Sequence, residues 1–132
     1  MLAFFHQLFE NLKTSPARKN KLILISLFLA LGLNIGIWLL LIIKFRAIAL
    51  SNPEKLTLPL HYNIYWGIDL FGQWYQGFIM PALGMAILIF NFILAIYFYS
   101  LKILASYFLI VSAAMVQIFL LISVILMILI NI

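Results

Sequence analysis

Three long stretches of the chain are strongly apolar, and the charged residues lie only outside them. Residues 22–43, 78–99 and 103–130 contain no Asp, Glu, Lys, Arg or His. A helix needs about 20 apolar residues to cross the hydrocarbon core of a bilayer, and each stretch is at least that long. The pattern therefore predicts three transmembrane helices, with a loop at 44–77 and a very short turn before the last helix.

The N-terminal segment has a different, amphipathic pattern. Apolar side chains recur on one helical face: Leu2, Phe5, Leu8, Phe9 and Leu12. Such a pattern is typical of a helix that lies in the membrane interface. Ser15 and Pro16 follow, and they are a favourable N-cap and first residue for the next helix. We expect an all-α integral membrane protein, with an interfacial helix at 1–15, one three-span domain at 16–132 and a folded loop between the first two spans.

The composition fits this class and excludes a soluble domain. Hydrophobic residues make up 67% of the chain and charged residues 8%, which is far from the composition of soluble domains. The net charge of +5 would suit a nucleic-acid partner. However, the basic residues lie near the ends of the apolar stretches, where they meet lipid headgroups. We therefore expect the lipid bilayer, and no nucleic acid, as their partner.

The basic residues also predict an orientation. Five lie on the N-terminal side of the membrane and three on the side of the loop: Lys13, Arg18, Lys19, Lys21 and Lys102 against Lys44, Arg46 and Lys55. Cytoplasmic segments carry the excess of Lys and Arg. We expect a multi-pass protein of the cytoplasmic (inner) membrane, with a cytoplasmic N-terminus and an external loop and C-terminus.

Small residues inside the apolar stretches indicate how the helices associate. Membrane helices pack through close backbone contact and interhelical hydrogen bonds, because lipid offers no hydrophobic gain. Gly32 and Gly36 form a Gly-x-x-x-Gly pair on one face of the first helix. Gly84 belongs to a stripe of seven-residue period on the second. We predict that these glycines lie in helix contacts.

Each apolar stretch also carries one amide near its midpoint. These are Asn34, Asn91 and Gln117. An amide at the bilayer centre is expected to find a hydrogen-bonding partner on another helix. We expect the three to meet and to fix the register of the helices. A polar node on a transport path is the alternative role.

The loop before the second apolar stretch contains an aromatic segment at 58–76. Apolar or aromatic residues occupy alternate positions from 58 to 66, which indicates an extended segment. Gly67 and Gly72 enclose residues 68–71, for which we predict a turn. Trp74 is expected at the membrane interface, where it anchors the start of the second helix.

Part of this loop resembles a known family. Its polar and turn-forming residues follow a Pro-x-His-x-Asn…Gly…Asp…Pro pattern: Pro59, His61, Asn63, Gly67, Asp69 and Pro81. The pattern is similar to that of a small membrane domain of unknown function found in SdpI-type immunity proteins and in short uncharacterised bacterial membrane proteins. The resemblance covers residues 56–91. It implies a bacterial cytoplasmic membrane protein and no assigned reaction.

The polar residues of the loop allow several roles. His61 and Asp69, with Glu54, offer metal ligands, but zinc sites need more strong ligands than one histidine and its neighbours supply. A hydrolase needs a nucleophile beside a base, and nothing organises Ser51, the only serine of the loop, around His61. We expect no catalytic residue, metal or cofactor. The polar side chains then either satisfy the loop backbone or form a recognition surface.

These features favour a small non-enzymatic membrane protein that acts by binding, as an accessory subunit or an immunity- or sensor-type module. The external loop 58–76 would recognise a partner membrane protein or peptide. The alternative is a transporter or channel component. Because three spans are few for a carrier, it would assemble as a homo-oligomer through Gly32 and Gly36.

Overall fold

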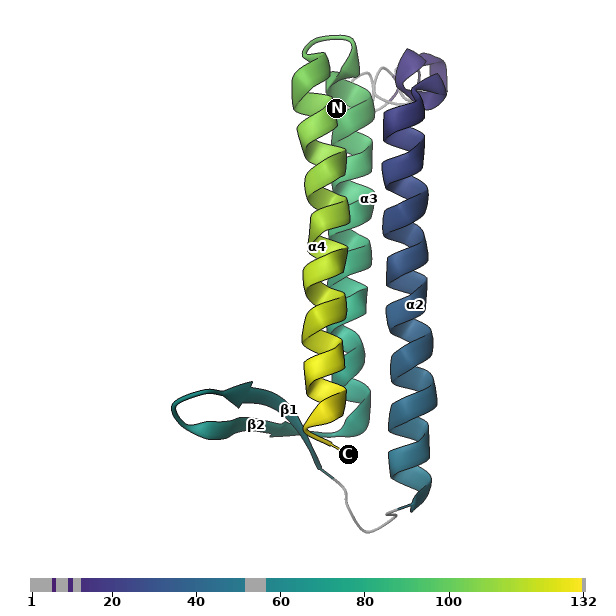
Figure 1. The fold of residues 1–132 in the computed structure, drawn as a ribbon. Coiled ribbons are helices and arrows are strands. Elements are labelled where there is room, and N and C mark those ends of the chain that lie inside the picture. The colour runs from purple at the N-terminus through teal and green to yellow at the C-terminus, as the bar shows by residue number, and fades with distance from the viewer. Residues whose placement is uncertain (1–5, 7–9, 11–12, 52–56, 132) are drawn as a thin grey trace.

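A computed structural model describes residues 6, 10, 13–51 and 57–131. The elements in chain order are the 3₁₀ helix η1 (Pro16–Lys19), helix α2 (Lys21–Ser51), strands β1 (Leu58–Asn63) and β2 (Gly67–Gly72), the 3₁₀ helix η2 (Trp74–Phe78), and helices α3 (Ile79–Tyr99) and α4 (Ile103–Leu129). The three long helices stand side by side, and the two strands project from one end of the bundle (Figure 1). The chain is thus mostly helical, with a small two-stranded sheet.

The predicted presence of three long apolar helices is confirmed, and the predicted loop at 44–77 begins later, because α2 extends to Ser51. Each helix is long and apolar enough to cross a bilayer, over Lys21–Ile48, Trp74–Tyr99 and Ile103–Leu129. α3 and α4 begin and end within one residue of the predicted stretches. α2 continues beyond the apolar stretch, through Lys44 and Arg46. Long basic side chains allow this because they carry their charge to water while the helix continues.

The predicted interfacial helix lies mostly outside the described residues. All five of its apolar positions are outside them: Leu2, Phe5, Leu8, Phe9 and Leu12. The described His6, Glu10, Lys13 and Thr14 have a helical backbone and exposed side chains. The location of the 1–15 helix in the interface stays a prediction.

Two polar side chains cap the helices at the N-terminal end of the bundle. Ser15 caps η1 rather than α2, because its Oγ accepts the backbone N–H of Ala17 at 3.3 Å. α2 begins directly after Asn20, whose Oδ1 accepts the N–H groups of Leu22 and Ile23 at 3.0 and 3.2 Å. The backbone donors at the start of α2 therefore have a side-chain partner, as a helix start requires.

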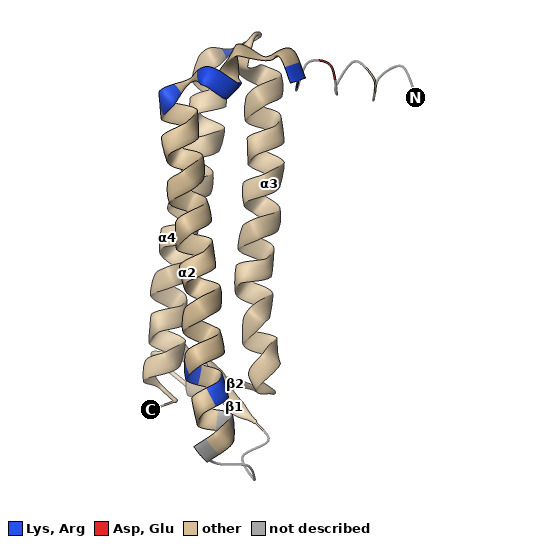
Figure 2. Ribbon diagram, turned by 90° about the vertical axis from the view of Figure 1, so that its right-hand side faces the viewer, with Lys and Arg blue, Asp and Glu red and all other residues tan. Residues whose placement is uncertain are grey.

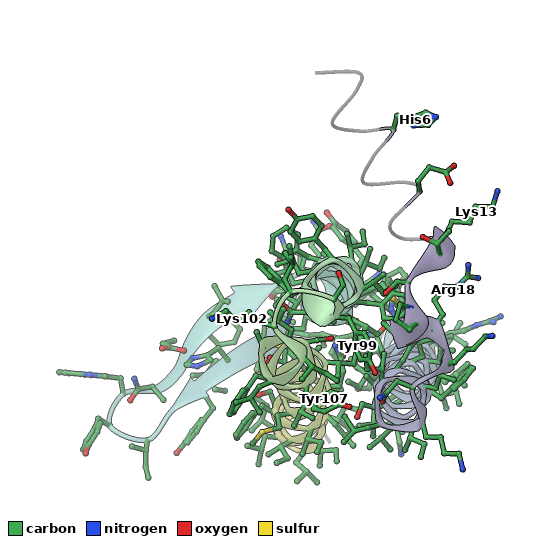
Figure 3. All side chains as sticks on the ribbon, turned by 90° about the horizontal axis from the view of Figure 1, so that it is seen from above. His6, Lys13, Arg18, Tyr99, Lys102 and Tyr107 are labelled. Carbon is green, nitrogen blue, oxygen red and sulfur yellow. The ribbon has the colours of Figure 1, made fainter. Side chains whose placement is uncertain are left out.

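The same asparagine joins the ends of the three helices. Asn20 Nδ2 donates to the hydroxyl oxygens of Tyr99 and Tyr107, at 3.0 and 2.9 Å. Figure 3 shows both tyrosines among the helix ends, seen from above. One amide thus connects the start of α2 with the end of α3 and the start of α4.

The core is formed by one buried stripe on each helix. α4 packs along both of its neighbours, whereas α2 and α3 touch each other over a smaller surface. The buried stripes include Ile23, Ala30, Ile37 and Phe45 on α2, Pro81, Gly84, Leu88 and Ala95 on α3, and Ser106, Ala113, Gln117 and Val124 on α4. The outer faces carry many exposed large apolar side chains, which suits contact with lipid.

The loop between α2 and α3 contains a β-hairpin, so the predicted all-α fold is wrong there. β1 pairs antiparallel with β2. The predicted extended conformation is confirmed over β1, but the predicted turn at 68–71 is wrong, because these residues belong to β2. The turn is at residues 64–66. Gly67 has a φ of 76° and closes this turn, so the glycine marks the end of the connection and not its start.

Candidate binding site at the hairpin

The base of the hairpin is fixed to the helix bundle. Leu58 and Leu60 are buried in an apolar cluster that also contains side chains of α2 and α4. Asn131, two residues beyond the end of α4, donates from Nδ2 to the carbonyl of Pro59 at 2.7 Å. Burial and a hydrogen bond therefore hold β1 beside the end of α4.

Local interactions define the hairpin turn. Asn63 Oδ1 accepts the backbone N–H of Tyr65 at 2.9 Å, which is an Asx-turn. Gly67 follows in the left-handed region, which glycine adopts without the steric cost of a side chain. A three-residue connection that is followed by such a residue is common in hairpins. Asn63 thus satisfies the loop backbone, which is one of the two roles predicted for the polar residues.

His61 and Asp69 meet across the two strands. His61 Nδ1 lies 2.6 Å from Asp69 Oδ1. The strand pairing shifts its register on both sides of His61, and such irregularities re-aim side chains. The pair occupies Nδ1 of the imidazole and leaves Nε2 for another partner. The two side chains are 55% and 39% exposed, which leaves them accessible to a ligand.

A cavity of about 270 Å³ lies between the hairpin and the end of α4. Its walls include Leu60, His61, Met80, Leu126 and Met127. Ser123 also lines it, but its Oγ donates to a carbonyl of its own helix at 3.0 Å. The cavity therefore offers mostly apolar walls with His61 as a polar group, which is typical of binding sites rather than of a nucleophilic centre.

The outer part of the hairpin is exposed and aromatic. Tyr65 and Trp66 at the turn are 87% and 83% exposed. Further exposed aromatic side chains lie on the strands and on η2: Tyr62, Phe71, Trp74 and Tyr75. The hairpin extends away from the helices (Figure 1). Exposed aromatic side chains gathered on one hairpin suit interaction with protein or membrane.

Trp74 lies where the hairpin joins α3. Its ring contacts those of Tyr75 and Phe78 edge-on, each at a centroid distance of 6.1 Å. Phe78 also lies against Trp38 of α2, with ring centroids 5.3 Å apart. The aromatic contacts thus connect the start of α3 to α2.

The described residues do not assemble a metal site. No group of three His, Cys, Asp or Glu side chains comes together among them. Glu54, the third ligand considered from the sequence, lies outside the described residues, and so does the side chain of Ser51. Within the described part, His61 and Asp69 bind each other.

The structure brings two of the three midpoint amides together. Asn34 Nδ2 donates to Gln117 Oε1 and to the carbonyl of Pro81, both at 3.0 Å. Gln117 Nε2 donates to the carbonyl of Gly84 at 2.8 Å. Asn34 and Gln117 are fully buried. The two amides therefore connect all three helices, and we call this cluster (Asn34, Pro81, Gly84 and Gln117) the amide node.

The third amide and two of the glycines lie elsewhere. Asn91 is half-buried and makes no hydrogen bond to the amide node. It is two turns beyond Gly84 along α3, roughly 10 Å away. Gly32 and Gly36 lie on the outer side of α2, where a Cβ added to either would meet nothing within 4 Å. Gly84, in contrast, is a point of close helix contact, since its Cβ would lie 2.5 Å from Leu120 Cδ1.

Two asparagines that matter were missed by sequence reasoning. Asn20 caps α2, and Asn131 donates both to Pro59 and, at 2.8 Å, to the carbonyl of Met127. Both lie at the edge of a long apolar stretch, Asn20 among basic residues and Asn131 between two isoleucines. The end of a helix leaves backbone N–H or C=O groups without partners inside the helix. A polar side chain at such a position is therefore a candidate cap, and this could have identified both asparagines.

Comparisons of the chain with protein-family models, with characterised proteins and with solved structures find no match. The resemblance to the membrane domain of SdpI-type immunity proteins stays a prediction. The geometry of the hairpin and of the bundle is therefore the basis for a functional conclusion.

Proposed function

We propose that this chain is a small non-enzymatic integral membrane protein that binds a partner membrane protein or peptide through its hairpin. Its role would be that of an accessory subunit or of an immunity- or sensor-type module in a bacterial cytoplasmic membrane. One observation carries the proposal. The base of the hairpin is buried and hydrogen-bonded to the bundle, whereas its outer part exposes Tyr65 and Trp66. Binding residues are often presented in this way by loops on a rigid scaffold.

The cavity beside His61 supports a specific mode of binding. An apolar side chain of the partner would fill the 270 Å³ cavity, and such buried anchors contribute most of the affinity of many interfaces. His61 Nε2 would supply a hydrogen bond that fixes the orientation of the partner. The exposed aromatic side chains around the turn would cover the rest of the contact.

The distribution of positive charge supports the proposed orientation. Lys and Arg gather at the end of the bundle that carries η1, and a smaller group lies near the other end of α2 (Figure 2). The described members of the smaller group are Lys44 and Arg46. The positive-inside rule then favours a cytoplasmic η1 end and an external hairpin.

Site-specific photo-cross-linking tests the proposal. A benzophenone amino acid replaces Tyr65 at the hairpin turn or, as the matched control, Leu101 in the exposed turn between α3 and α4. Irradiation of native membranes should give a discrete protein adduct from position 65 and none from position 101. His61→Ala should weaken the adduct severalfold, because the cavity loses its polar group. Adducts with lipid alone at position 65, or equal protein adducts at both positions, would contradict a partner-binding hairpin.

An oligomeric transporter or channel component is the second candidate. The observation that favours it is the outward position of Gly32 and Gly36, which leaves a small-residue face of α2 free of the neighbouring described helices. Such faces allow close approach of a second membrane helix. A water path through one copy is disfavoured, since Asn34 and Gln117 are fully buried and hydrogen-bonded. A channel would therefore form between copies.

A further inference from the structure

An open groove lies at the end of the bundle opposite the hairpin. It has a volume of about 450 Å³ and runs between the start of α2 and the end of α3. Leu24, Phe92, Ile93 and Ile96 form its apolar walls, and Arg18 lies at its mouth. The groove exists because α2 and α3 both pack more closely on α4 than on each other. It therefore leads from a cationic rim into the apolar zone of the helices.

The residue at the rim is held in place by its surroundings. Arg18 belongs to η1, in which Ala17 is fully buried. Ser15 Oγ donates to the carbonyl of Ile96 at 3.3 Å, so η1 is connected to α3. Arg18 donates one guanidinium N–H to the carbonyl of Lys13 at 3.0 Å. Guanidinium carries five N–H groups, so several donors remain for an anion.

The basic side chains around this groove form no ion pair with an acidic side chain among the described residues, although Glu10 lies three residues before Lys13. The cations of this end are Lys13, Arg18, Lys19, Lys21 and Lys102. Within the described part of the chain, none of them forms an ion pair with Asp or Glu, since the single ion pair is His61–Asp69. Figure 3 shows Arg18 and Lys13 on one side of the bundle and Lys102 on the other. The side with the groove thus carries Arg18 and Lys13 outside any ion pair among the described residues.

We infer that this groove binds an anionic phospholipid, with Arg18 on the headgroup phosphate and the Leu24–Phe92–Ile93–Ile96 walls against an acyl chain. The inference rests on insertion of the bundle in a bilayer but not on partner binding by the hairpin. A guanidinium recognises phosphate through parallel hydrogen bonds, and basic pockets between membrane helices are known to bind lipid headgroups. The groove matches both parts of a phospholipid. Its positive charge lies at the helix ends, where the headgroup would be, and its apolar walls lie along the helices, where the acyl chain would be.

The shape of the groove distinguishes lipid from other anions. A free phosphate needs only the cation and would leave the apolar walls unoccupied. A partner helix would need an acidic residue at the level of Arg18 and would have to cover the groove along its length. A phospholipid satisfies the rim and the walls with one molecule.

Lipid retention measured by native mass spectrometry tests the inference. The full chain is released from micelles that contain equal amounts of phosphatidylglycerol and phosphatidylcholine. The wild type should retain phosphatidylglycerol preferentially. Arg18→Gln should reduce that preference on the order of tenfold, because charge-assisted hydrogen bonds are lost. Lys102→Gln, the matched control, removes one charge at the same end of the bundle but away from the groove and should leave the preference unchanged.

Two further variants separate a defined site from diffuse attraction. Arg18→Lys keeps the charge and should retain part of the preference. Ile93→Trp fills the groove and should reduce lipid retention with Arg18 in place. Equal losses for Arg18→Gln and Lys102→Gln, or displacement of the lipid by millimolar glycerol 3-phosphate, would overturn the inference. Folding of each variant is checked by its helical circular dichroism, and Arg18→Lys serves as the comparison if Arg18→Gln does not fold.

Discussion

The side-chain amide of Asn34 connects all three helices in the middle of the bundle. It donates to Gln117 on α4 and to the Pro81 carbonyl on α3. Its own Oδ1 is buried without a hydrogen-bond partner among the described residues. The net stabilisation is therefore smaller than two full hydrogen bonds, because one polar atom remains unsatisfied. In membrane proteins, each interhelical hydrogen bond contributes about 0.6–2 kcal/mol.

Removing this amide should weaken the bundle, whereas removing the amide of Asn91 should not. We expect Asn34→Ala to lower the free energy of unfolding by about 1–2 kcal/mol. Asn91→Ala should lower it by less than about 0.5 kcal/mol, as is usual for sites away from such networks. Both are measured by denaturant titration in micelles. Equal losses for the two variants would show that the amide node is not what fixes the helices.

The partners of the amides were predictable only in part. Asn34 and Gln117 lie at matching depths because each is near the middle of its own helix. The depth of Asn91 was misjudged because η2 continues α3 toward the hairpin, so that the apolar span begins at Trp74. That moves the middle of the span toward Gly84, whose carbonyl then meets Gln117.

At the scale of the elements, close helix contact depends on Gly84. A Cβ there would lie 2.5 Å from Leu120 Cδ1 and 2.9 Å from Gln117 Oε1. Contact this short forces neighbouring side chains or the helix itself to move. Gly32 differs, because a Cβ added there would meet nothing within 4 Å.

The two glycines should therefore respond differently to alanine. We expect Gly84→Ala to destabilise the bundle by about 1–3 kcal/mol. Gly32→Ala should be neutral or stabilising by up to about 1 kcal/mol, because alanine is the better helix former. Thermal unfolding in micelles measures both effects. A loss of stability in Gly32→Ala as large as that in Gly84→Ala would contradict this expectation. It would indicate that the outer face of α2 packs against a second copy of the chain, as an oligomeric channel requires.

The long helices were predictable from the sequence, and the hairpin was not. An uncharged stretch of sufficient length determines where a membrane helix forms, so α3 and α4 were located to within one residue. Two glycines bracket residues 68–71, and they suggested a turn there. The Asx-turn of Asn63 and the positive φ of Gly67 place the turn earlier instead. The alternating pattern of a short aromatic segment does not show which of these two positions holds the turn, and therefore does not fix the register of the strands.

The whole molecule has two chemically different ends. One end carries η1, five of the described Lys and Arg residues and the groove beside Arg18. The other carries the hairpin, with its exposed aromatic turn and the His61–Asp69 pair. α2, with 31 residues, is about 46 Å long and exceeds the apolar thickness of a bilayer. Its last turns, with Lys44 and Arg46, would therefore reach the interface near the hairpin.

Cysteine labelling in intact cells tests whether the bundle separates these ends across a membrane. The chain has no native cysteine, so Tyr65→Cys in the hairpin and Leu101→Cys in the turn between α3 and α4 provide one site each. With a membrane-impermeant maleimide, the Tyr65→Cys variant should react from outside. The Leu101→Cys variant should react only after the membrane is permeabilised. Reaction of both variants from the same side would contradict a three-span bundle that presents its hairpin on the external face.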